Sequence, residues 1–477
     1  MSFHVWDADA WYYARIGEAL IHGDALGATT LYVPPLFGWL LSLLGPWMSP
    51  WITVFQSLCL VLASLALWRL GRTMGTASAF PAALMLLFSH ALERYGLQGL
   101  PDAPFVALHL LLLGELLAET PRLKWIFPLL LLLSLLRFDT LLYMPLYALA
   151  PMVLKGRPLM PAWRSVGLAS VFVLAILVNW THVRHGVWMP SPRFSMLYPP
   201  VGEDQLLEAG TTLWREMAAE GRSMPAFTSA DCDRAEQAGA RETENQGVTG
   251  LPAVMAWQFM ELTASGQLGF VGVLMVLVAL AQSPLSRRLA LMAAAFTVTY
   301  AFLGPRERYL SFSVPLWLLV GSMSLPSLNR WGPMVLIAWV LFQVREGAYH
   351  IRHPEAQPLE LRMAADWLSN EEAGVVANAG AILSREGSVA YHARRDWWRL
   401  PTGTRDEIVQ WVNRGGIAYV VADSRFLRSK RPSQTWLLDP DQVPWPCVKT
   451  LEYGEGAGQQ SVRIYEVPPR VVSVGNR

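Results

Sequence analysis

Two carboxylates near the start of the chain are the residues best suited to proton transfer. Asp7 and Asp9 directly precede a segment whose apolar positions Trp11, Ile16 and Leu20 suit one face of a helix. A carboxylate near a membrane surface can act as a general base, taking a proton from a weak nucleophile as it attacks. Aspartate is also a very common helix N-cap, so both interpretations stay open for each residue.

Other charged residues suggest a site that could bind a phosphate group. Asp102 lies in the segment GLPDAPF and Arg137 in LLRFDTLL, while Arg306 and Arg308 stand just before Tyr309. Arginines can hold a phosphate through charge-assisted hydrogen bonds. The alternatives are lipid headgroup contacts and salt bridges for the arginines. For Asp102 the alternative is simple capping of the helix at Pro104.

The chain that must position these residues is unusually apolar. Of its 477 residues 53% are hydrophobic and only 16% are charged, against roughly 25% charged in soluble domains. The apolar runs are confined to residues 33–346, which predicts a mainly α polytopic membrane protein with about ten transmembrane helices. The net charge of +1 gives no reason to expect a nucleic-acid partner. The predicted spans are 51–71, 76–92, 103–119, 124–137, 139–154, 164–182, 266–283, 289–304, 309–325 and 331–346.

Lysine and arginine near the ends of these runs predict their orientation. Clusters such as Arg69 with Arg72 and Arg122 with Lys124 are expected to be cytoplasmic. The alternation holds only if residues 124–154 cross the membrane twice, with Arg137 and Asp139 at an outer turn. The alternative is one kinked helix with a buried ion pair. We expect residues 1–50, 93–102, the loop 183–262 and the C-terminal region to share the extracytoplasmic face of the cytoplasmic membrane.

Residues 350–477 have ordinary soluble composition and predict an extracytoplasmic α/β domain. Residues 361–368 suit a helix, and residues 406–412 suit a second one. The β-rich runs 374–377, 388–392 and 417–421 predict strands, and 448–452 with 462–467 predict a closing hairpin. This order indicates a small layered sheet.

Residues 1–50 are expected to hold the acidic motif and interfacial helices. A second apolar helix is predicted to begin after Pro34-Pro35, where proline is tolerated in a first turn. Trp39, Trp47 and Trp51 suit a helix lying at the membrane interface.

Taken together, the motifs resemble the GT-C superfamily of membrane glycosyltransferases that use polyprenyl-phosphate sugars. The nearest branch is the group of protein O-mannosyltransferases and aminoarabinose transferases. The match rests on the acidic motif followed by Tyr12-Tyr13-Ala14 and His22-Gly23-Asp24, and on the Pro-Pro-Leu segment. It continues through the segments of Asp102, Arg137 and Arg308-Tyr309, and through SVAYHARRDWWRLP in the C-terminal region. The resemblance covers nearly the whole chain.

The resemblance implies an inverting transfer of a sugar to a lipid, glycan or protein acceptor. Asp9 matches the family's catalytic aspartate best, with Asp7 as runner-up, and Asp102 would be an electrostatic or acceptor-site group. The leaving lipid phosphate needs cations or a metal ion, while no second protein acid is required. Arg137, Arg306 and Arg308 would bind the phosphate, and Tyr12, Tyr13 and Tyr309 would line the acceptor and lipid groove.

The sequence departs from the family at three points. The family places a spanning helix before its acidic motif, whereas Asp7 follows only six residues here. Tyr32-Val33 stands where the aminoarabinose branch has Glu-Lys, so that lysine's phosphate contact cannot be carried over. The oligosaccharyltransferase motif WWDYG is absent, which disfavours transfer of whole oligosaccharides to asparagine.

A divalent metal ion is compatible with the sequence but not established by it. The histidines expected on the outer face have no diagnostic spacing, and solvated or hydrogen-bonded histidines are the better expectation. They are His182, His185, His350, His353 and His392. Two other functional classes stay open. One is a transporter or flippase of lipid-linked sugars, and the other is a non-catalytic assembly subunit related to the glycosyltransferases.

Overall fold

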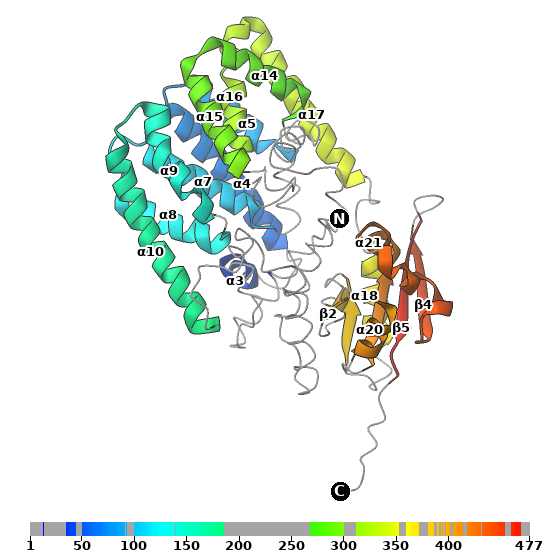
Figure 1. The fold of residues 1–477 in the computed structure, drawn as a ribbon. Helices are drawn as coiled ribbons and strands as arrows, with labels where there is room; N and C mark the ends of the chain where they lie inside the picture. Colours follow the sequence, from blue (N-terminus) through cyan, green and yellow to red (C-terminus); the bar gives the residue numbers. More distant parts are fainter. Residues whose placement is uncertain are drawn as a thin grey trace.

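The computed structural model shows a helical bundle followed by a smaller domain built around a sheet (Figure 1). It describes residues 13, 35–43, 50–90, 92, 100–138, 140–185, 268–299, 312–352, 359–371, 380–385, 389–390, 393, 395, 397–400, 404–413, 417–430, 432–453 and 459–468.

Each of the ten predicted spans contains a helix of the bundle. The helices are α4 (Pro50–Thr73), α5 (Ala79–Leu87), α7 (Asp102–Leu116), α8 (Leu123–Leu136), α9 (Thr140–Lys155), α10 (Leu159–His185), α14 (Gly269–Gln282), α15 (Pro284–Thr299), α16 (Val314–Ser322) and α17 (Gly332–Arg352). The short helix α3 (Pro35–Leu43) begins at the predicted proline, and a 3-10 helix, η4 (Leu325–Trp331), precedes α17. The predicted helical segments are therefore present.

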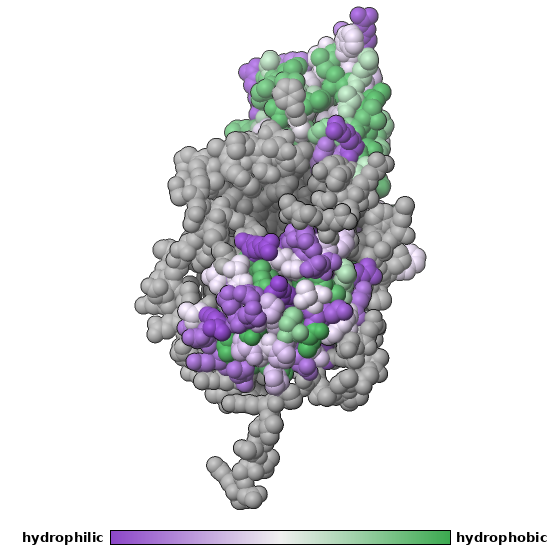
Figure 2. Space-filling view, turned by 90° about the vertical axis from the view of Figure 1, so that its right-hand side faces the viewer, coloured by the Kyte–Doolittle hydropathy of each residue, from purple (hydrophilic) through white to green (hydrophobic). Residues whose placement is uncertain are grey.

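The bundle exposes an apolar surface that suits lipid. On α17 the side chains of Met334, Ile337 and Leu341 are each more than half exposed, and similar residues line α4 and α10. Contiguous apolar patches of this kind are unfavourable in water. Figure 2 shows hydrophobic side chains over the helices at the top of the molecule and a mostly hydrophilic C-terminal domain below. The surface of the bundle therefore suits a lipid bilayer, and the surface of the C-terminal domain suits water.

Helix length sets a stricter test of membrane crossing. Among the described residues one helix, Trp51–Thr73, is both long and apolar enough to span a membrane. Shorter apolar helices are Leu123–Leu136, Thr140–Lys155, Arg164–Asn179 and Val271–Gln282. The total of about ten crossings and the side of the membrane on which each loop lies stay predictions.

The two ends of α7 carry different polar groups. Near its last turn Glu115 forms an ion pair with Arg122 (Nε–Oε1 3.0 Å), and Arg157 donates to the carbonyl of Ala118. The loops after α7 and α9 therefore meet at one end of the bundle. Asp102 lies at the opposite end of α7, about 20 Å away at 1.5 Å per residue.

The C-terminal domain contains a mixed sheet in the order β2-β1-β3-β5-β4. Its strands are β1 (Ala381–Ser384), β2 (Trp397–Arg399), β3 (Ile417–Asp423), β4 (Cys447–Tyr453) and β5 (Gln460–Glu466). β1 pairs in parallel with both β2 and β3, whereas β3–β5 and β5–β4 are antiparallel. The predicted strand in 417–421 and the predicted closing hairpin are confirmed.

Helices cover both faces of this sheet because side chains alternate along each strand. Ile382, Val421 and Ile464 face α18 (Leu359–Glu371), while Leu383, Val420 and Tyr465 pack in the cluster of α20 (Arg405–Val412) and α21 (Ser424–Lys430). The 3-10 helices η6 (Pro432–Leu438) and η7 (Pro440–Gln442) precede β4. The predicted layered α/β domain is confirmed.

One strand prediction is wrong. Within residues 388–392 the described residues Val389 and Ala390 are helical, and both are buried in the cluster against α18. Packing of a short apolar run against the sheet overrides its β propensity. The strand predicted at 374–377 lies outside the described residues.

A buried polar cluster closes the end of β3. Glu360 accepts two hydrogen bonds from Arg425 (2.6 and 3.2 Å), and the Arg425 amide donates to Asp423 Oδ1 (2.8 Å). Glu360 and Asp423 are both buried, so two carboxylates lie beside one arginine, Glu360 on its guanidinium and Asp423 on its backbone amide. Burial, reinforced by the charge of Glu360, raises the pKa of Asp423 to about 7, against the opposing effect of its contacts with Arg425 and Phe426.

The raised pKa predicts that Asp423→Asn stabilises the domain most at high pH. A folded-state pKa above the unfolded value means that folding favours the protonated acid, so its stability contribution is lost as pH rises toward 7. The gain from Asn over Asp should grow by about 2–3 kcal/mol between pH 5 and pH 8. Hydrogen exchange of the β3 amides in the full-length protein, with wild type and variant compared at each pH, measures this gain. A difference that does not change with pH would contradict the assignment.

Candidate functional site

A buried ion pair joins two of the predicted site residues. Arg137 Nη1 lies 3.2 Å from Asp102 Oδ1, and the side chains are 4% and 0% exposed. The two residues are 35 positions apart in the sequence. Taking two such charges out of water is costly, and good geometry offsets the cost only in part. A pair in this position therefore suggests a purpose other than stability.

Backbone geometry explains how each partner reaches the other. Pro101 is the N-cap of α7, so Asp102 occupies its first turn, where a negative charge is favoured by the helix dipole. Gln56 of α4 donates to the carbonyl of Leu100 (2.8 Å) and holds the chain that leads into this turn. Arg137 follows α8 in an extended conformation (φ −151°, ψ 117°), which ends the helix.

Two alternatives from the sequence can be assessed on this geometry. Asp102 is not the N-cap of α7, since Pro101 occupies that position. Residues 123–155 are not one kinked helix, since α8 ends at Leu136 and α9 begins at Thr140. The interruption places Arg137 between two helices, as the predicted turn requires. Asp139 lies outside the described residues.

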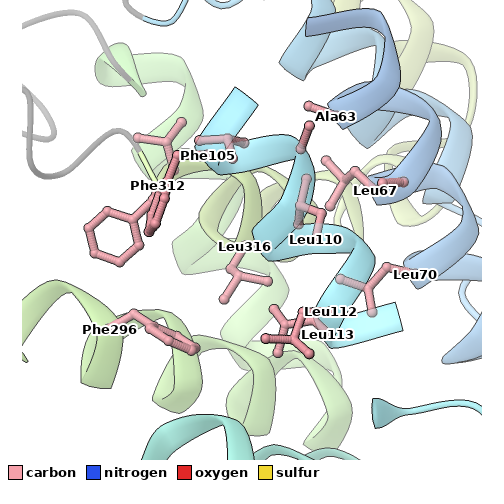
Figure 3. Packing of buried hydrophobic residues seen from close by; sticks show 14 of the residues in the cluster. Ala63, Leu67, Leu70, Phe105, Leu110, Leu112, Leu113, Phe296, Phe312 and Leu316 are labelled. Atoms are coloured by element: carbon pink, nitrogen blue, oxygen red, sulfur yellow. The ribbon is translucent and has the colours of Figure 1, made fainter. Parts of the chain in front are cut away.

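An aromatic cluster that the sequence did not reveal lies beneath this pair. The guanidinium of Arg137 lies over the ring of Phe105, 5.4 Å from its centroid. Phe105 in turn contacts Phe312 edge to face (6.3 Å), and Phe312 contacts Phe296 of α15 (6.2 Å). Figure 3 shows Phe105 of α7 beside Phe312, with Phe296 approaching from α15. The cluster connects α7 to the start of α16.

The centre of this aromatic cluster holds a histidine. His109 of α7 is fully buried, and its Nδ1 lies 2.7 Å from the hydroxyl of Tyr147 on α9. Its ring meets Phe296 and Phe312 edge to face, at 5.0 and 6.0 Å between centroids. The available sequence signal was a histidine seven residues after Asp102, which is on the same helical face.

Hydrogen bonds join the two helices that flank the segment carrying Arg306, Arg308 and Tyr309. Thr297 Oγ1, in the last turn of α15, lies 3.0 Å from Ser313 Oγ at the start of α16. The indole of Trp317 donates to the same Thr297 oxygen (3.1 Å). The two ends of residues 300–311 are therefore held together next to Phe296 and Phe312.

The remaining predicted site residues divide into two groups. Tyr13 is buried and packs edge to face on Phe37 of α3 (5.1 Å), so its ring takes part in the packing of that helix. The others lie outside the described residues: Asp7, Asp9, Tyr12, Arg306, Arg308 and Tyr309. The part of the chain that the structure describes contains no group of three or more His, Cys, Asp or Glu residues able to hold a metal ion.

The buried pair predicts a large effect when one partner is removed. Arg137→Leu leaves the Asp102 carboxylate buried without its cation, which should cost about 3–5 kcal/mol of stability. Arg122→Leu is the matched control, because Arg122 pairs with Glu115 but is 51% exposed, and such pairs contribute about 0–1 kcal/mol. Thermal unfolding of the purified full-length protein in detergent compares the two variants.

The double variant Asp102→Leu/Arg137→Leu should be less destabilised than the sum of its single variants, because it leaves no buried charge. Equal losses for Arg137→Leu and Arg122→Leu, or strictly additive single effects, would show that the pair is not a coupled buried ion pair.

Neither a protein-family model nor a curated protein matches the sequence. Among solved structures, the Archaeoglobus fulgidus oligosaccharyltransferase, crystallised in complex with Zn and sulfate, is similar in fold. It is 15% identical, has a TM-score of 0.54, and the match covers 88% of this chain and 64% of that one. Two structures of ArnT from Cupriavidus metallidurans also align. One is in the apo state and one is bound to undecaprenyl phosphate, and each is 12% identical with a TM-score of 0.42. These two matches cover 96% of this chain and 93% and 94% of the ArnT chains. The chain has a GT-C-like fold.

Proposed function

We propose that this protein is an inverting glycosyltransferase of the cytoplasmic membrane. It moves one sugar from a polyprenyl phosphate to a lipid, glycan or protein acceptor on the extracytoplasmic face. The observation that carries the proposal is the Asp102–Arg137 pair, which brings together two motif segments that the family resemblance had marked independently. The GT-C-like fold supports the same class of reaction.

The reaction needs a general base and positive charge to stabilise the leaving phosphate. In the proposed mechanism Asp9 removes the proton from the acceptor hydroxyl or amide as it attacks the anomeric carbon, with Asp7 as the second candidate. The bond to the lipid phosphate breaks on the opposite face of the sugar, so the anomeric configuration inverts. The phosphate leaves as an anion without protonation by a second acid, and cations stabilise it.

The negative charge of Asp102 beside Arg137 affects which arginines can stabilise the leaving phosphate. Asp102 already compensates the charge of Arg137, so Arg137 attracts a phosphate less strongly than an uncompensated arginine would. We assign the larger share to Arg306 and Arg308. Arg308 is four residues from Phe312, and an extended chain limits that separation to about 14 Å. In this proposal Arg137 makes a weaker contact with the phosphate, and Asp102 holds its guanidinium in a fixed orientation.

The groove for the lipid is assigned to the boundary between the bundle and its interfacial segments. α3, the predicted interfacial helix, packs against α8, and Arg137 directly follows the last residue of α8. Tyr12, Tyr13 and Tyr309 belong to the segments that would flank this groove. A divalent metal ion would act on the same phosphate, and its involvement is part of what the assay decides.

Asp9→Asn is the direct test of the proposed base. Loss of a general base should lower sugar transfer by about 10²–10⁴-fold, while Asp7→Asn should have a smaller effect. The assay uses purified full-length protein with a panel of polyprenyl-phosphate sugars, with and without a chelator. Mass spectrometry of envelope glycolipids and glycoproteins from cells with and without the protein identifies the acceptor.

Two results would count against the proposal. Transfer by Asp9→Asn at the wild-type rate would remove Asp9 as the base. No transfer by the wild type with any donor, together with an unchanged set of envelope glycans in its absence, would favour a carrier or a scaffold.

A further inference from the structure

The imidazole of His109 is an unusual group for its position. It is fully buried in α7, four residues after Phe105 and seven after Asp102, and all three share one helical face. Its surroundings are the rings of Phe296 and Phe312. Burying a polar side chain away from water is costly unless its polar atoms are hydrogen-bonded.

Packing does not account for this histidine. Its Nδ1 bonds to Tyr147, but its Nε2 is buried and has no hydrogen-bond partner among the described residues. The net gain from one hydrogen bond is no larger than the cost of a second ring nitrogen left without one. A leucine or phenylalanine would fill the space without that cost. The feature that only the polar pair supplies is a directional link between α7 and α9.

That link fixes the axial register of α9 against α7, and the turn that carries Arg137 directly precedes α9. His109 lies seven residues into α7 from Asp102, and Tyr147 lies seven residues into α9 from Thr140. At 1.5 Å per residue each separation is about 10 Å. The His109–Tyr147 contact joins α7 to α9, and the Asp102–Arg137 contact joins α7 to the turn just before α9. The Thr140 amide donates to the Arg137 carbonyl (3.1 Å), so the start of α9 is bonded to that turn. A slip of α9 by one residue along α7 would displace Tyr147 from His109 by about 1.5 Å and pull on the turn that holds Arg137.

We propose that His109, through Tyr147, is a positioning residue for the Asp102–Arg137 pair in the transfer reaction. This inference rests on the proposed function. The hydrogen bond holds α9, and with it the turn that carries Arg137, in register with Asp102. The same imidazole contacts Phe296 and Phe312, which bracket residues 300–311. Loss of the bond shifts Arg137 relative to Asp102 without removing either side chain.

Tyr147→Phe tests the link with the smallest change, since only the hydroxyl is lost. A misplacement of about 1 Å in a site can lower kcat by about 100-fold, and we expect a loss of about 10- to 100-fold here. The KM for the polyprenyl-phosphate donor should change much less than kcat, and the melting temperature should fall no further than in a variant that loses a comparable buried hydrogen bond elsewhere. Tyr465→Phe is the matched control, because it removes an equally short buried bond, to the Leu437 carbonyl (2.7 Å), in the C-terminal domain. Its kcat should be unchanged.

Two replacements of His109 separate positioning from packing. His109→Asn places an amide near the position of Nδ1 and should keep most of the activity by bonding to Tyr147. His109→Gln places the amide near Nε2 and should match Tyr147→Phe, and combining it with Tyr147→Phe should cause no further loss. A wild-type kcat for Tyr147→Phe, or equal losses for His109→Asn and His109→Gln, would overturn the inference. An inactive wild type would instead overturn the proposed function, and this inference with it.

Discussion

The buried contact between Asp102 and Arg137 is the interaction on which the rest of the structure depends. It closes a connection between the start of α7 and the turn before α9, in a region where water is not available to solvate either charge. Two neighbouring side chains restrain its partners. Gln56 holds the chain before Asp102, and Phe105 lies under the guanidinium of Arg137. The geometry of the pair is therefore determined by several helices together.

A second constraint is that the bundle and the C-terminal domain suit different surroundings, lipid for the bundle and water for the domain. The bundle exposes leucine, isoleucine and phenylalanine side chains, and its polar links are hidden between helices. The C-terminal domain has two separate apolar clusters on the two faces of one sheet, as expected for a domain surrounded by water. The candidate site lies at an end of the bundle.

The bundle could be predicted from the sequence because lipid imposes long apolar runs and intrahelical hydrogen bonding. Asp102 and Arg137 were identified separately, since a charge beside an apolar run stands out. Their contact could not be predicted, because it joins residues 35 positions apart through tertiary packing. His109 and Tyr147 were missed for a different reason. A single histidine within a leucine run has no spacing that distinguishes it. The four-residue strand β1 is too short for its periodicity to be recognised.

The central claim is that the acidic N-terminal segment, the ion pair and the C-terminal domain act on one side of the membrane. Labelling of single cysteines in intact cells tests it most directly, with Cys59, Cys232 and Cys447 replaced. A membrane-impermeant maleimide should label Asp9→Cys and Gln459→Cys without permeabilisation, and Arg122→Cys only after it. Labelling of Asp9→Cys and Gln459→Cys from opposite sides would contradict the account, because the proposed site could then not assemble.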